Sequence, residues 1–144
     1  MDLLEISASA LSAQRTRMSA IAGNIANANT TRDEAGRPIP YRRLEVVFAA
    51  GAPGQDGQPG VHVDEVRPSR DPYRWTYDPS HPDAEKDPAS ERLGYVLLPK
   101  VNVVEEMVDM MLASRAYEAN LAAMEATRTM RSAALRISAS CRCR

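Results

Sequence analysis

Aromatic side chains are scarce in this sequence. They make up 5% of its 144 residues, and Phe48 is the single phenylalanine. The apolar fraction of 44% comes mainly from Ala, Val and Leu and from seven methionines. This supply of large side chains is too lean for a thick globular core, and it favours closely packed helices.

Cysteine is almost absent as well. Cys141 and Cys143 are the only two, and both lie in the last four residues. They are too close in sequence to link distant parts of a fold, and too few for a four-ligand zinc site. We therefore expect residues 139–144 to form a frayed tail.

Neither sign of charge dominates, and no hydrophobic run is long. The chain has 18 basic and 19 acidic residues, so nothing pulls it toward nucleic acid or membrane. No apolar run approaches the roughly 18 to 20 residues that span a bilayer. Asp2 and Glu5 stand where a signal peptide carries positive charge, so we expect no cleavable signal and either a cytosolic location or another export route.

Motifs for catalysis are also missing. No G-x-S-x-G elbow surrounds a serine, and neither His62 nor His81 has a motif partner. Glu105, Glu106 and Asp109 could form a carboxylate metal site with one histidine, but acids in a first helical turn are explained by the helix dipole. A His-Pro-Asp triplet begins at His81, as in J-domain co-chaperones, yet flanking prolines exclude the two helices that it joins there. We expect no catalytic, cofactor or metal site.

Two long segments show the seven-residue periodicity of helical seams. In residues 3–28, Leu4, Leu11, Met18 and Ile25 recur every seventh residue, opposite a face of small polar residues. In residues 103–137, Met110, Tyr117 and Met124 do so, with a companion row that includes Met107 and Leu121. We predict that the two rows meet in a coiled-coil-like pair. The first half of the second helix is apolar on more than one face, so further copies of the chain are needed to cover it.

Asparagines gather at the predicted helix ends. Asn is a poor helix former that tolerates the left-handed conformation closing a helix, and Asn102 precedes Glu105 in the spacing of a capping box. The cluster in GNIANANTT indicates a helix end combined with a register device. The predicted register and helix-end residues are Asn24, Asn27, Asn29, Asn102 and Asn120.

The middle of the chain differs from its ends in composition and in residue pattern. Residues 41–50 and 61–67 read as short strands around the glycine-rich loop 51–60, and the proline-rich segment 67–88 reads as extended, turn-rich chain. The predicted fold class is mainly α with a small β insertion.

Three separated blocks resemble the bacterial flagellar basal-body rod proteins. They are AGNIANANTTRDEAGRPIPYRR (22–43), YDPSHPDA (77–84) and GYVLLPKVNVVEEMVDMMLASRAYEAN (94–120). The Asn-rich block is general to rod and hook proteins, whereas the TTR continuation and the VNVVEEM block are specific to a subunit of the proximal rod. The likeness extends over about residues 1–138, and it departs from the family at Gly23, at Lys100 and in the tail.

The resemblance implies a structural protein and not an enzyme. Residues 1–32 and 101–138 would form a helical rod core, residues 33–100 a β-containing extension, and residues 139–144 a tail. Such subunits leave through the flagellar type III export apparatus and assemble in the periplasm into the drive shaft that carries torque to the distal rod and hook. The implied partners are other copies, neighbouring proximal and distal rod subunits, the inner-membrane ring protein and the export apparatus.

Two other interpretations stay open from the residues alone. A cytosolic coiled-coil adaptor would use the same stripes, but it would be folded as an isolated protein. A carboxylate-metal enzyme would bind a divalent ion with defined stoichiometry.

Overall fold

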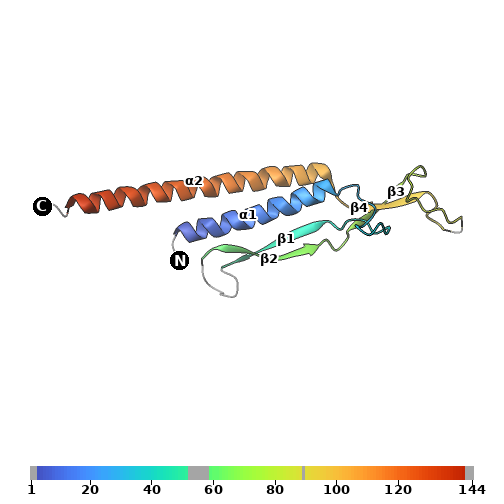
Figure 1. Ribbon diagram of the computed structural model, residues 1–144, viewed down its shortest axis with the longest axis horizontal. Helices are drawn as coiled ribbons and strands as arrows, with labels where there is room; N and C mark the ends of the chain where they lie inside the picture. The colour runs from blue at the N-terminus through green and yellow to red at the C-terminus, as the bar shows by residue number, and fades with distance from the viewer. Residues whose placement is uncertain (1–2, 52–58, 89, 142–144) are drawn as a thin grey trace. The chain divides into compact units, whose positions relative to one another are not determined.

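The computed structural model describes residues 3–51, 59–88 and 90–141, and side chains only up to residue 137. Its helices are α1 (Leu3–Ala26) and α2 (Val103–Cys141), at either end of the chain. The strands between them are β1 (Leu44–Ala50), β2 (Val61–Pro68), β3 (Tyr73–Tyr77) and β4 (Tyr95–Pro99), as Figure 1 shows. They form two separate two-stranded sheets, β1–β2 and β3–β4. The chain is therefore mainly α with a small β insertion, as predicted.

Helix α2 is the longest element, with 39 residues. It starts just after Asn102, whose side-chain oxygen accepts a hydrogen bond from the Val104 N–H at 3.2 Å, as an N-cap residue does. It continues to Cys141, so the first residues of the predicted tail are helical instead of frayed. Cys143 and most of the predicted loop 51–60 lie outside the described residues.

Part of the segment 67–88, predicted as extended, turn-rich chain, is the strand β3, which pairs with β4. They pair in antiparallel fashion, with Tyr73 opposite Pro99, Trp75 opposite Leu97 and Tyr77 opposite Tyr95. Side chains alternate across a strand, so these residues share one face of the β3–β4 ribbon. Pro72 and Pro79 are outside β3, where their missing N–H groups remove no ladder hydrogen bond.

The chain divides into two compact units, and each contains parts of both helices. The first comprises residues 1–18, 46–65 and 111–144; the second comprises residues 19–45 and 66–110. In the first, the Val61 N–H donates to Ser9 Oγ at 3.3 Å, and Ser114 Oγ lies 3.7 Å from Met18 Sδ. In the second, Val96 and Val101 are buried. The predicted division into helical core, extension and tail stays a prediction.

None of the described helices has a stretch that is both long and apolar enough to cross a lipid bilayer.

Candidate assembly interface

One face of α2 is turned toward its own chain. A row of half-buried and buried positions on it follows a heptad spacing of alternating three and four residues: Val103, Glu106, Met110, Ala113, Tyr117, Asn120, Met124 and Thr127. The row of Met110, Tyr117 and Met124 lies on this face. The companion row within the chain is Glu106, Ala113 and Asn120, one residue earlier than expected, and Met107 and Leu121 are 51% and 40% exposed.

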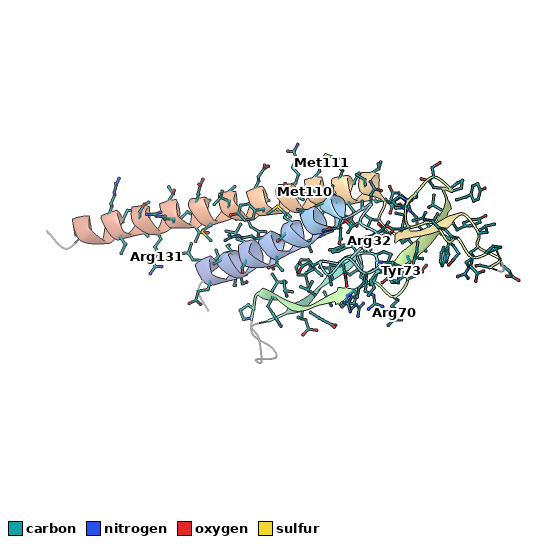
Figure 2. The ribbon with its side chains drawn as sticks, turned by 45° about the vertical axis from the view of Figure 1, so that its right-hand side comes forward. Arg32, Arg70, Tyr73, Met110, Met111 and Arg131 are labelled. Carbon is teal, nitrogen blue, oxygen red and sulfur yellow. The ribbon has the colours of Figure 1, made fainter. Side chains whose placement is uncertain are left out.

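The opposite face of α2 is apolar and open to solvent. At 100° per residue, positions 104, 108 and 111 fall on one stripe, about half a turn away from positions 106 and 113. Figure 2 shows Met111 projecting outward from the helix. The open face consists of Val104, Met107, Val108, Met111 and Leu112, all between 47% and 69% exposed. The second apolar face predicted from the sequence is therefore present, and the chain itself leaves it uncovered.

The last described turns of α2 are exposed on every side. All residues from 128 to 137 are exposed, and they include Met130, Leu135 and Ile137 at 64% to 70%. In α1, the row of Leu4, Leu11, Met18 and Ile25 is only half-buried. The role of these residues and of the α2 row in a seam between copies stays a prediction.

Asn24 is the centre of a buried hydrogen-bond network in the second unit. Only 1% of it is exposed. Its Nδ2 donates to Leu44 O at 2.9 Å and to Glu106 Oε2 at 3.1 Å. Its Oδ1 accepts from the Leu44 N–H at 2.8 Å and from the Tyr41 hydroxyl at 3.2 Å. The two donors and two acceptor sites of the amide are all used, so Asn24 fixes the first residue of β1 much as a neighbouring strand would.

Glu106 completes this network with a charge. It is 1% exposed, and its Oε1 accepts a hydrogen bond from Arg43 Nε at 2.7 Å. Arg43 also donates to Glu45 Oε1 at 3.2 Å. Burial opposes the charge of Arg43, but the hydrogen bond and charge of Glu106, together with the charges of Glu45 and Asp109, outweigh it and raise the arginine pKa. Burial, and then the charge of Glu106, raise the pKa of Tyr41, so its hydroxyl stays protonated and able to donate to Asn24.

The other predicted register residues make local contacts. Asn27 Nδ2 donates to Gly23 O at 2.9 Å, and Asn120 Nδ2 donates to Ala116 O at 2.8 Å, each within one helical turn. Asn27 Oδ1 also accepts from Thr30 Oγ1 at 3.2 Å, which helps to close the end of α1. Asn29 is exposed. Among these residues, Asn24 is the one that bonds to the other helix.

A second polar cluster joins the segment after α1 to the segment after β3. Asp83 Oδ2 accepts from Thr31 Oγ1 at 2.7 Å, and Asp83 Oδ1 accepts from Arg32 Nε at 2.9 Å. These two donors, Arg32 first, lower the pKa of Asp83. The ring of His81 accepts from the Asp83 N–H at 3.1 Å. The His-Pro-Asp triplet therefore shapes a turn and anchors it to Arg32.

The described residues do not form the carboxylate-metal site that was considered for Glu105, Glu106 and Asp109 with a histidine. Both oxygens of Glu106 already accept hydrogen bonds from Asn24 and Arg43. In the part of the chain that the structure describes, no three His, Cys, Asp or Glu side chains are grouped to hold a metal ion. The arrangement is suited to fixing backbone geometry and presenting surfaces.

Sequence reasoning missed Arg43, Tyr41 and the inward direction of Glu106. Glu106 was assigned to the helix dipole, although it lies three residues after Val103 and four before Met110, in the inward heptad row. A charged residue in that row needs a buried partner, and this was the available signal. Nothing local marked Arg43 as that partner, because 63 residues separate the two.

Comparison with known proteins identifies the family. The model of the flagella basal body rod protein matches residues 4–32, and that of the flagellar basal body rod FlgEFG protein C-terminal matches residues 92–137. The flagellar basal-body rod protein FlgC of Borreliella burgdorferi is 39% identical, covering 93% of this chain and 94% of its own length. The protein of the same name from Bacillus subtilis is 38% identical over 93% and 95%, and that from Salmonella typhimurium is 39% identical over 90% and 91%. The chain therefore belongs to the family of the flagellar basal-body rod protein FlgC and is a structural rod subunit.

Proposed function

We propose that the chain polymerises through its terminal helices into the proximal rod of the bacterial flagellum and carries torque toward the distal rod and hook. The observation that supports this most directly is the open apolar face of α2. Large apolar side chains contribute about 1.5 to 3 kcal/mol each when they are removed from water. Five of them in three consecutive turns form a surface that favours burial against another molecule.

Within each subunit, α1 and α2 would pair in coiled-coil fashion. The heptad spacing of the inward row on α2 is typical of such a seam, and the bonds of Asn24 to Glu106 and of Ser114 to Met18 link the helices at two places. The helical core would then comprise residues 1–32 and 101–138, with residues 33–100 as an outer extension.

The proposed partners follow from this assembly. They are other copies of the chain, neighbouring proximal and distal rod subunits, the inner-membrane ring protein and the flagellar type III export apparatus. The proposed location is the periplasmic part of the basal body. The proposed role is mechanical and not enzymatic. The stiffness that it requires would come from many repeated helix contacts.

A charge placed in the open face tests the proposal. Met111 is 60% exposed, so Met111→Asp should leave the isolated subunit folded while burying an unpaired carboxylate at any copy-to-copy contact. We expect loss of incorporation into basal bodies and loss of motility, with normal expression. Met111→Leu is the matched control, and it should assemble and swim. Normal incorporation of the aspartate variant would contradict the proposal.

A further inference from the structure

The few aromatic residues of this chain are concentrated on one surface. Of seven in total, four share one face of the β3–β4 ribbon by strand register: Tyr73, Trp75, Tyr77 and Tyr95. Three of them are open to solvent, with Trp75 at 44%, Tyr77 at 63% and Tyr95 at 38% exposure. Exposed aromatic clusters of this kind are typical of protein contact surfaces.

The surroundings of the exposed rings are acidic. Residues 78–92, which lead from β3 toward β4, contain five carboxylate side chains and two basic ones. A hollow of about 340 Å³ near the end of the ribbon is lined by Tyr77, Leu93 and the charged pair of Glu85 and Lys86, among others. We call this region, with Trp75, Tyr77, Tyr95, Glu85 and Glu91, the acidic aromatic end.

A cleft that we call the basic cleft lies elsewhere in the same unit. Its volume is about 750 Å³, and its charged lining consists of Arg43, Arg74, Lys100, Asp71 and Glu105. Two of its three cations are paired within the chain, Lys100 with Asp71 and Arg43 with Glu45 and Glu106, which leaves Arg74 as the cation open to a partner. The segments that contribute to it, 42–45, 67–74 and 100–106, carry six basic and four acidic side chains. Arg70 and Arg74 are exposed and form no ion pair with a described residue, so both are available to a partner.

Two aromatic rings of the ribbon are in contact with arginine side chains of the same chain. The guanidinium of Arg92 lies over the ring of Trp75, 4.5 Å from its centroid, and that of Arg42 lies 6.0 Å from the centroid of Tyr73. Such cation–π contacts favour arginine, whose planar group stacks on ring faces. Tyr77 and Glu85 line the same hollow, and the Glu85 N–H donates to Tyr95 O. A carboxylate that attracts a further arginine therefore lies near these two rings.

We propose that the acidic aromatic end of one copy docks against the basic cleft of the next copy, with Arg70 and Arg74 of the second copy received by the rings and carboxylates of the first. This inference rests on the proposed self-assembly, and it adds a contact outside the terminal helices. The two surfaces differ and lie on the same chain, so the contact is head-to-tail and can repeat from copy to copy. The opposite local charges fix its direction.

Crosslinking in basal bodies tests the contact. Two chains are coexpressed, one with Arg74→Cys and one with Glu91→Cys, in a background where Cys141 and Cys143 are serine. A short bismaleimide should join position 74 of one copy to position 91 of another. The matched control pairs Arg74→Cys with Glu34→Cys, another exposed site of the same unit, and should give no product. Incorporated chains without the 74–91 product, or a product joining position 91 to a different protein, would overturn the inference.

Charge reversal supplies an independent measurement. Arg70→Glu with Arg74→Glu should weaken swimming, and so should Asp87→Arg with Glu91→Arg, both pairs being assayed by motility. All four changes in one chain should restore swimming, because each reversed surface then meets a reversed partner. If neither pair affects swimming, or if the combination fails to restore it while circular dichroism shows folded protein, the contact is wrong. Failure of the proposed function differs, because chains would then be absent from basal bodies whatever their charge pattern.

Discussion

Asn24 and Glu106 show how buried polar residues can specify local geometry. Each is 1% exposed, and each has its hydrogen-bonding atoms paired with groups far away in the sequence. A buried carboxylate without its partner is costly, so the network forms only when the end of α1, the start of β1 and the start of α2 are all in place.

Removing Arg43 should therefore destabilise the second unit. Arg43→Met keeps the apolar stem but deprives Glu106 of its charged donor, and the free energy of unfolding should fall by about 1 to 3 kcal/mol. Chemical denaturation followed by the fluorescence of Trp75, the only tryptophan, measures it. Arg42→Met is the control, because Arg42 is exposed and contacts a ring instead of a buried carboxylate. Equal effects of the two changes would contradict the role given to Glu106.

The hydrogen bonds of Asp83 make the stability of the fold depend on pH. The pKa of Asp83 is lowered from 3.8 by hydrogen bonds from Arg32 and Thr31, so the folded state holds the ionised form. The stabilisation is fully present above the ordinary pKa, and it is lost as the pH falls through the lowered one. The stability difference between the wild type and Asp83→Asn should thus be largest near neutrality and shrink below about pH 4. Thermal unfolding across pH measures it, and a constant difference would exclude the contribution of this carboxylate.

Gly94 is required by both its backbone and its neighbour. Its φ is +79°, and an added Cβ would lie 2.9 Å from Tyr77 Cε2. Gly94→Ala should cost about 1 to 3 kcal/mol and displace the Tyr77 ring. Gly36 has a similar φ of +76° with nothing within 4 Å of an added Cβ. Gly36→Ala therefore destabilises the fold only through the strain of a positive φ. Denaturation of both variants should rank Gly94→Ala as the less stable; the opposite order would refute the ring contact.

At the scale of elements, periodicity predicted the helices well. Heptads in residues 3–28 and 103–137 correspond to α1 and α2, because an apolar residue at every seventh position is a local signal. Within the chain, the inward positions of α2 include Glu106 and Asn120, while the predicted companions Met107 and Leu121, which are larger and more apolar, are exposed. The place of these two residues in a seam between copies stays a prediction. The inward positions are set by a polar network that no local pattern reveals.

The strands were only partly predictable. β1 and β2 have β-branched and aromatic residues on either side of a glycine-rich turn, which is a recognisable signal. β3 was missed because prolines surround it and its partner, β4, follows after a long connection. The alternation of Tyr73, Trp75 and Tyr77 was the available strand signal. The candidate site was predictable where apolar rows define it, and not where pairing joins residues 63 or 82 positions apart.

At the scale of the whole molecule, contacts are unevenly distributed along the helices. The second unit has the dense network around Asn24 and Glu106, whereas α2 from residue 128 to 137 is exposed on all sides. Isolated helical segments of this length are marginal in water. In the proposed assembly, the far end of α2 gains its stability from neighbouring subunits.

Amide hydrogen exchange compares the lone subunit with the assembled subunit most directly. In the lone subunit at low concentration, residues 128–137 should exchange almost as fast as unfolded chain, while amides near Leu44 and Glu106 should be protected. In purified basal bodies the same α2 amides should become strongly protected. Firm protection of residues 128–137 in the lone subunit, or continued rapid exchange after assembly, would contradict the account.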